Sequence, residues 1–306
     1  MRLNENSELF KSAIVNTSES LGILNEYVEK DYWLFLTLKE IFKENNLGYV
    51  FKGGTSLSKC YRLINRFSED IDISYNISYA SLSLGDKKRK FRGIESAIKR
   101  AGLNIDNLTN LRRDRYFNQF ICPYPSFFDS GSIKNKIVIE LAAQAPSFPS
   151  ESKTIESFIG QYFESVGQHD LVVQYELEPF KLNVQSLSRT LVDKLFAICD
   201  YYLEDKCVNH SRHIYDIHKL LTVVRLDNEL VALVKEVRNI RKKIPICYSA
   251  KEGNKLYLIF ESIISLDSFK KDYENQTMVL LYEKINYFEC KESLLKLESF
   301  FKKHDI

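Results

Sequence analysis

Two aspartates and a pair of glycines are the residues of this chain best suited to chemistry. Asp70 and Asp72 lie in the run Asp70-Ile71-Asp72-Ile73, which follows the run Lys52-Gly53-Gly54-Thr55-Ser56. Alternate side chains of a strand share a face, so the two aspartates point the same way, about 6.6 Å apart along the strand. Carboxylates this close repel each other unless a cation intervenes, and Mg²⁺ prefers a few carboxylates plus substrate phosphates. The pair predicts a clamp for a metal and a nucleoside triphosphate (NTP); a solvated strand face is the alternative.

The glycine pair is predicted to turn the chain from a short strand, residues 48–51, into a helix. Adjacent glycines permit a tight turn with positive φ and the close approach of another group to the backbone. We expect Thr55 or Ser56 to cap this helix, because hydroxyl side chains accept hydrogen bonds from free N–H groups. The N–H groups at a helix start also favour phosphate.

A third acid is available on a later strand. In the run Lys136-Ile137-Val138-Ile139-Glu140-Leu141, the residues Ile137, Ile139 and Leu141 fall on one face and Glu140 falls on the other. An acid within so apolar a strand is costly to bury without a partner. Glu140 therefore has either a functional or salt-bridged role, or it faces solvent or pairs with a lysine.

Two charged residues lie beside apolar helical stripes in the second half of the chain. Lys194 accompanies Leu191 and Leu195, and on a cleft wall its ammonium would neutralise phosphate charge. Alternatively, its stem packs on the core while the amine reaches solvent. Asp216 follows His213 by three residues and would orient Lys194 or a base. Its alternative role is a surface ion pair with Arg212 or Lys219, which would contribute little.

In this order, these blocks resemble the AbiEii/AbiGii-type toxin nucleotidyltransferases of the DNA-polymerase-β-like superfamily. The glycine turn and the run Arg66-Phe67-Ser68-Glu69-Asp70-Ile71-Asp72 match the first two motifs of that family without interruption. The blocks around Lys194 and Asp216 resemble the third and fourth motifs. The block Glu29-Lys30-Asp31-Tyr32-Trp33 also resembles the family, but a charged and aromatic helix that packs on the core is the favoured explanation for it. The resemblance implies a catalytic role for Asp70, Asp72, Lys194 and Asp216, metal binding by Asp70, Asp72 and Glu140, and nucleotide contacts from Lys52, Gly53, Gly54, Thr55, Ser56, Lys59, Arg66, Ser68 and Arg189.

The hydrophobic pattern predicts an α/β fold with two domains. Residues 1–185 are expected to form a nucleotidyltransferase-like mixed β-sheet lobe flanked by helices, and residues 186–306 a helical lobe that closes the active-site cleft. Helices are expected at 8–21, 26–44, 86–101, 151–166, 187–203, 211–224, 227–242, 254–266 and 289–303, and strands at 48–51, 70–73, 117–124, 136–143 and 171–184.

Composition narrows the class of protein. The chain has 306 residues, 44% hydrophobic and 27% charged, with a net charge of +2, which is ordinary for a globular protein. Its six cysteines form no Cys-x-x-Cys pair, and no apolar run suggests a signal peptide or a membrane span, so a cytoplasmic location is expected. No P-loop, dinucleotide-binding or serine-hydrolase motif occurs. Cys207, His210, His213 and His218 match no usual zinc spacing.

The function predicted is that of a metal-dependent nucleotidyltransferase toxin from a toxin–antitoxin or abortive-infection system. The resemblance implies Mg²⁺, with Mn²⁺ as the alternative ion, an NTP substrate, RNA and chiefly the 3′ end of tRNA as acceptor, and a cognate antitoxin as partner. Basic residues gather at 87–92, 112–116 and 238–243, and the aromatic residues Phe91 and Tyr116 in the first two stretches suit RNA contacts. A solvated charged face is the expected interpretation for at least one of the three stretches. Two alternatives stay open: transfer to a protein side chain, or a nucleotide- or RNA-binding module without catalysis.

Overall fold

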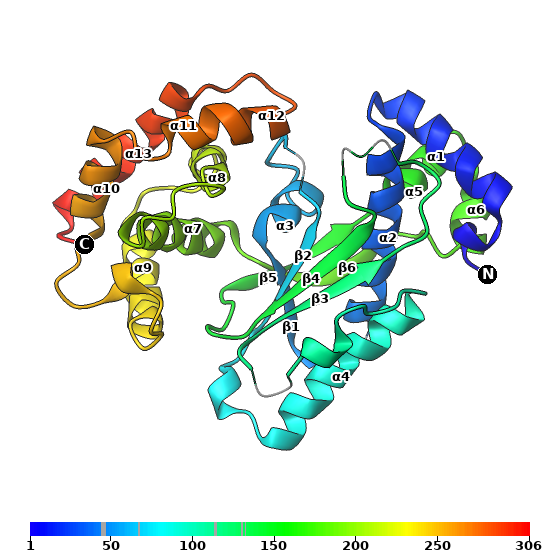
Figure 1. The fold of residues 1–306 in the computed structure, drawn as a ribbon, viewed down its shortest axis with the longest axis horizontal. Helices are drawn as coiled ribbons and strands as arrows, with labels where there is room; N and C mark the ends of the chain where they lie inside the picture. Colours follow the sequence, from blue (N-terminus) through cyan, green and yellow to red (C-terminus); the bar gives the residue numbers. More distant parts are fainter. Residues whose placement is uncertain (44–46, 67, 113–114, 130, 132) are drawn as a thin grey trace. The chain divides into compact units, whose positions relative to one another are not determined.

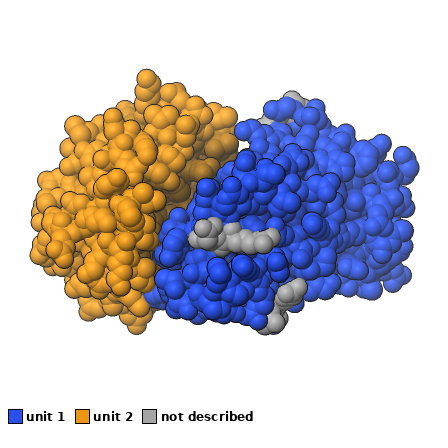
Figure 2. Space-filling model, turned by 60° about the horizontal axis from the view of Figure 1, so that its bottom comes forward, with its two compact units in different colours: residues 1–60, 69–184 blue, residues 61–68, 185–306 orange. Residues whose placement is uncertain are grey.

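The structure is a computed structural model that describes residues 1–43, 47–66, 68–112, 115–129, 131 and 133–306. Phe67 of the Arg-Phe-Ser run and Arg113 and Asp114 of a basic stretch lie outside the described residues. The chain divides into two compact units, coloured separately in Figure 2. The first comprises residues 1–60 and 69–184, and the second comprises residues 61–68 and 185–306. That the second lobe closes a cleft stays a prediction.

A six-stranded mixed sheet forms the centre of the first unit (Figure 1). Its spatial order is β3 (Phe117–Pro123), β4 (Lys136–Ala142), β2 (Asp70–Tyr75), β1 (Tyr49–Lys52), β6 (Phe180–Gln185) and β5 (Ser150–Ile155). β2 runs parallel to β4, and β1 parallel to β6, whereas β1–β2 and β3–β4 are antiparallel. Alternation decides which side is covered: Ile71, Ile73 and Ile139 are fully buried, while Asp70 and Asp72 on the opposite face are half-buried.

The helices of the first unit are α1 (Ser7–Leu21), α2 (Asn25–Phe42), α3 (Gly53–Lys59), α4 (Leu84–Arg100), α5 (Phe158–Ser165) and α6 (His169–Gln174), with 3₁₀ turns at Leu3–Glu5, Tyr79–Ser81 and Leu108–Asn110. α2 and α4 cover the apolar face of the sheet (Figure 1). Phe91 of α4 packs against Phe120 of β3 with ring centroids 5.4 Å apart. Because Phe120 shares its face with Ile139 and Ile71, the face that carries the aspartates is the one opposite these helices.

The second unit is helical. It contains α7 (Leu187–Leu203), α8 (Arg212–Leu220), α9 (Asn228–Arg241), α10 (Leu256–Ser265), α11 (Lys270–Asp272), α12 (Met278–Leu280) and α13 (Tyr287–Lys303), with a 3₁₀ turn at Tyr248–Ala250 and a π-helical turn at Tyr273–Thr277. Side-chain caps start the long helices: Ser186 caps α7, and Asn286 with Glu289 forms a capping box on α13. Residues 61–68 join this unit, where Arg66 pairs with Leu281 in an antiparallel bridge.

The structure confirms the predicted α/β class, but two predicted elements are wrong. Residues 151–166 are not one helix, because β5 occupies Ser150–Ile155 and α5 starts at Phe158 after the cap Ser157. The segment 171–184 is not one strand either, because its beginning lies in α6 and only its end lies in β6. β5 is an edge strand with mostly exposed side chains, so it shows no apolar alternation. Within the described residues, no helix has both the length and the apolarity needed to cross a bilayer.

Candidate functional site

Four polar residues form a row across the face of the sheet opposite α2 and α4. The register pairs Lys52 of β1 with Asp72 of β2, Asp72 with Glu140 of β4, and Glu140 with Gln119 of β3. Gln119 donates from Nε2 to Glu140 Oε1 at 2.9 Å. The structure thus brings together the predicted residues Lys52, Asp72 and Glu140. Gln119 was missed, because strand alternation in β3 indicates its face but not its neighbour.

The glycine turn lies directly against this row. Gly53 has a φ of 78°, a backbone conformation that L side chains rarely adopt. A Cβ atom placed on Gly53 would lie 1.9 Å from Oδ2 of Asp72 and 2.7 Å from its Cγ. The absence of a side chain at Gly53 is therefore what lets the Asp72 carboxylate occupy its position. The two features singled out in the sequence, the glycine bend and the acidic pair, form one local structure.

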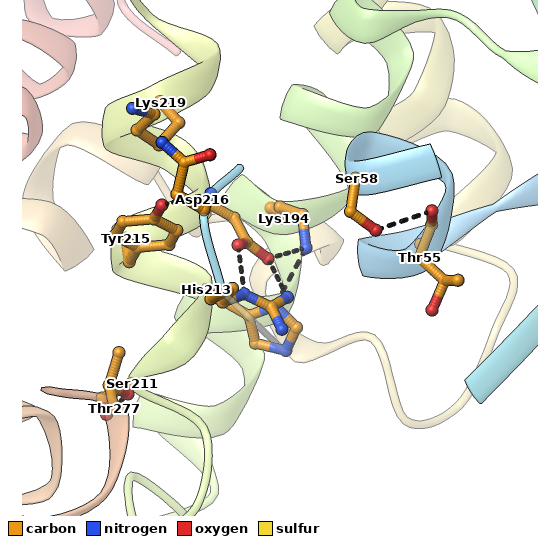
Figure 3. A network of polar contacts seen from close by, with 12 residues as sticks. Thr55, Ser58, Lys194, Ser211, His213, Tyr215, Asp216, Lys219 and Thr277 are labelled. Atoms are coloured by element: carbon orange, nitrogen blue, oxygen red, sulfur yellow. Dashed lines mark hydrogen bonds and ion pairs between the residues drawn. The ribbon is translucent and has the colours of Figure 1, made fainter. Parts of the chain in front are cut away.

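α3 starts earlier than its hydroxyl residues suggest. The helix begins at Gly53 with Lys52 as N-cap and no side-chain capping bond, so the prediction of Thr55 or Ser56 as the cap is wrong. The reason is that Gly53 makes the turn, which leaves both hydroxyls inside the helix. Ser56 Oγ donates to the Gly53 carbonyl at 2.8 Å, and Ser58 Oγ donates to the Thr55 carbonyl at 3.0 Å (Figure 3). Both Thr55 and Ser56 are buried. Their predicted contacts with the nucleotide stay predictions.

Lys59, at the end of α3, is engaged within the first unit. Its ammonium pairs with the Asp31 carboxylate, and it lies 4.0 Å from the centre of the Phe158 ring. Asp31 also accepts a hydrogen bond from the Phe158 main-chain N–H at 2.7 Å. These contacts anchor the exit of α3 to α2 and α5. The predicted nucleotide contact of Lys59 stays a prediction.

A buried ionic cluster occupies the second unit (Figure 3). Asp216 of α8 is fully buried and accepts from Lys194 Nζ of α7 at 2.6 Å. Arg66 binds the same carboxylate with two nitrogens, Nε to Oδ1 at 2.7 Å and Nη2 to Oδ2 at 2.8 Å. As expected, Asp216 contacts Lys194, but the alternative of a surface pair with Arg212 or Lys219 is wrong, because α8 turns this residue toward the interior of the unit.

Two cations share one carboxylate in this cluster, which leaves an excess positive charge. Burial by itself would raise the pKa of Asp216, but Arg66 and Lys194 outweigh it and hold that pKa well below the ordinary carboxyl range. Burial is the main cause that lowers the pKa of His213, and the neighbouring Lys194 adds to it. His213, 3.4 Å from Lys194, is therefore neutral at neutral pH. Burial also lowers the pKa of Lys194, a shift that the Asp216 carboxylate opposes. The Arg66 guanidinium and the Lys194 ammonium carry the positive charge of the cluster.

Arg189 and Ser68, which were predicted to contact the nucleotide, lie at the start of α7 and just before β2. Arg189 is buried and donates from Nε to Asp193 Oδ1 at 3.2 Å, so the structure uses its charge within α7. Ser68 is half-buried just before β2.

No group of three or more His, Cys, Asp or Glu in the described part of the chain is arranged to hold a metal ion. The His-rich segment gives no support to zinc, since His210 stacks on Tyr201 and His218 Nδ1 bonds Ser293 Oγ at 2.9 Å.

Comparison with known families settles the class. A family model described as "Nucleotidyl transferase AbiEii toxin, Type IV TA system" matches residues 35–285. The chain belongs to the AbiEii nucleotidyltransferase toxin family. The match covers the glycine turn, both aspartates, Lys194 and Asp216, and it confirms the family predicted from the motifs. Among curated proteins none matches the chain.

Membership of the AbiEii family establishes the activity in outline. The protein is a nucleotidyltransferase that uses a nucleotide substrate, and it is the toxin of a type IV toxin–antitoxin system, in which an antitoxin is its counterpart. The family match begins after residues 29–31, so the Glu29-Lys30-Asp31 run lies outside the matched range.

Proposed function

We propose that this AbiEii toxin transfers a nucleotide from an NTP to RNA in a reaction that requires a divalent metal, with the 3′ end of tRNA as acceptor. The observation that carries the proposal is the contact of Gly53 with Asp72 inside the row Lys52, Asp72 and Glu140. A backbone open to close approach, set beside a carboxylate pair, is suited to a triphosphate and its metal.

The donor set fits a hard divalent ion. Asp70 and Asp72 lie on one face of β2, and Glu140 is the register partner of Asp72. Carboxylate oxygens are the ligands that Mg²⁺ and Mn²⁺ prefer, and Mg²⁺ usually takes its remaining ligands from water and substrate phosphates. Asp70 and Asp72 would hold the ion, with Glu140 as the third candidate ligand. When bound, the ion would offset negative charge on the phosphates.

Residues of the chain would orient the substrate for in-line displacement. The main chain at Gly53 and Gly54, with Ser68, would hold phosphate oxygens, and Lys52 would add a positive charge beside Asp72. Lys194, held in place by Asp216, would stabilise negative charge on the phosphates. The acceptor hydroxyl oxygen bonds to the α-phosphorus and gives its proton to water, the bond from that phosphorus to the pyrophosphate oxygen breaks, and pyrophosphate leaves.

The buried positions of Arg66 and Arg189 favour roles other than the nucleotide contacts that the family resemblance implies. Both are buried and paired with carboxylates of the second unit, Arg66 with Asp216 and Arg189 with Asp193. We infer that Arg66 acts through Asp216, by fixing the carboxylate that holds Lys194. Direct contact with the nucleotide remains the alternative for both arginines.

The experiment is incubation of the protein with each labelled NTP, Mg²⁺ and a mixture of cellular RNA and protein. We expect label in the tRNA fraction, reduced at least about 100-fold by Asp70→Ala, because that variant lacks half of the acidic pair. Label on protein bands would support transfer to a protein side chain instead. Tight NTP binding without pyrophosphate release would support a binding module. No label in either fraction, together with an Asp70→Ala variant as toxic in cells as the wild type, would refute the proposal.

A further inference from the structure

We propose that Lys30 of α2 is a positioning residue for the acids of the sheet, because it ties together the points at which the chain enters β2 and β4. The inference rests on the proposed function of Asp70 and Asp72. It concerns a residue that precedes the range of the family match.

Lys30 bridges the two strands that carry the acids. Its ammonium donates to the Glu69 carboxylate and, at 2.9 Å, to the carbonyl oxygen of Lys134. Glu69 is the residue immediately before β2, and Lys134 lies two residues before β4. Because β2 and β4 are neighbours that run parallel, their first residues lie at the same end of the two strands. One buried ammonium therefore links the starts of the strands that hold Asp70, Asp72 and Glu140.

The residues on either side of Lys30 hold the adjoining segments. Glu29 accepts hydrogen bonds from the Ser126 hydroxyl at 2.6 Å and from the Phe127 N–H at 2.9 Å, in the connection between β3 and β4. Asp31 pairs with Lys59 at the exit of α3. Burial is the main cause that raises the pKa of Glu29, while the hydrogen bonds it accepts oppose that shift. A single turn of α2 thus contacts the exit of the glycine helix, the start of β2 and the β3–β4 connection.

Stability alone does not account for this run of charges. Glu29, Lys30 and Asp31 are only 0%, 3% and 7% exposed. Burying a charge is costly even when it is paired, and an apolar residue of similar volume is often equally stable or more so. The Glu69 side chain is 34% exposed, so water screens part of its attraction to the buried Lys30 ammonium. What the pair does supply is a fixed position, which a catalytic group needs to within about 0.5 Å.

The test compares Lys30→Met with a matched control on the same helix. Methionine keeps the packing of the stem and removes the ammonium. Lys39 of α2 also donates to a carbonyl, that of Glu176 at 2.7 Å, and pairs with a glutamate, Glu178 at 3.3 Å, so Lys39→Met repeats the change away from the acids. Lys30→Arg is the conservative variant that can restore both contacts. The readouts are kcat and KM for label transfer, Mn²⁺ binding in the presence of a non-hydrolysable NTP by electron paramagnetic resonance, and the melting temperature.

We expect Lys30→Met to lower kcat about 10- to 100-fold with little change in KM, since a displacement of about 1 Å has effects of this size. Mn²⁺ binding should weaken about tenfold, and Lys30→Arg should recover most of both losses. The binding readout separates position from charge, because loss of a nearby positive charge would by itself tighten the binding of a cation. Lys39→Met should match the wild type in kcat and Mn²⁺ binding.

Each remaining outcome decides the question. Wild-type kcat and Mn²⁺ binding in Lys30→Met, with Asp70→Ala inactive, would overturn the inference and leave the proposed function intact. Full activity in Asp70→Ala would overturn the proposed function itself. If Lys30→Met does not fold, Glu69→Gln gives the answer, because it weakens the same link from the more exposed partner. A kcat in Glu69→Gln equal to that of the wild type would then overturn the inference.

Discussion

Replacing Gly53 by alanine tests the contact on which the proposed site depends. Gly53 combines a φ of 78° with a position where a Cβ atom would lie 1.9 Å from Oδ2 of Asp72. The added methyl group has two effects, because it strains the backbone and it displaces the carboxylate. We expect Gly53→Ala to fold and to lose nucleotidyl transfer.

The two effects have different magnitudes. A left-handed conformation costs a non-glycine residue about 1–2 kcal/mol, which a domain of this size tolerates. The contact cannot be relieved by the carboxylate tip alone, because Cγ and Cβ of Asp72 would lie only 2.7 and 3.0 Å from the new atom. The side chain must therefore rotate or the turn must move, by an ångström or more. A shift of that size in a catalytic group typically costs about 100-fold in rate.

Gly167→Ala is the control that isolates the contact. Gly167 belongs to the same unit and has a φ of 74°, but a Cβ atom there would meet nothing within 4 Å. Both variants should lose about 1–2 kcal/mol of unfolding free energy in urea titrations. Only Gly53→Ala should lose label transfer and Mn²⁺ binding. Wild-type transfer in Gly53→Ala, or an equal loss in Gly167→Ala, would refute the reasoning.

Three further predictions concern the ionic cluster and the metal. Asp216→Asn should lose about 3–5 kcal/mol of unfolding free energy at pH 7, measured in urea, because two buried cations lose their carboxylate. The pKa of Asp216 is lower in the folded protein than in the unfolded chain, so the stability it contributes is present above about pH 4 and disappears as the pH falls further. Urea titrations at pH 7 and pH 3 should therefore show that Asp216→Asn loses less unfolding free energy between these two pH values than the wild type does. Arg66→Lys, which cannot bind both oxygens in the same planar geometry, should lose about 1–3 kcal/mol in the same titration, and an unchanged midpoint would contradict the pairing. Chelation with EDTA should abolish label transfer, and Mg²⁺ or Mn²⁺ should restore it; transfer that persists in EDTA would exclude the metal clamp.

The strands that carry the acids could be predicted from the sequence, because their signal is local. In β2 and β4, apolar and acidic residues alternate with a period of two, and the structure places Ile71 and Ile139 inside and Asp72 and Glu140 on the other face. The glycine turn is equally local. β5 gave no such signal, because an edge strand depends on its partner and not on an apolar face.

The partners of the charged residues could not be predicted, because they are set by tertiary structure. Arg66 and Asp216 are 150 positions apart, and the sequence pattern around one of them does not indicate that it contacts the other. The same holds for Lys30, whose contacts with Glu69 and Lys134 lie 39 and 104 positions away. Patterning shows which side chains face inward, whereas the identity of a buried partner follows only once the elements are packed.

Residues 61–68 have a consequence for dividing the gene into fragments. The polypeptide passes from one unit to the other after Cys60, Ser68 and Val184, so no single cut separates them. A fragment beginning at Gln185 would keep Lys194 and Asp216 but would lack Arg66, and Leu281 would lose its bridge. Such a fragment should be soluble and unfold cooperatively only when residues 61–68 are present. They could be added as a separate octapeptide or joined covalently to the fragment in a rearranged chain.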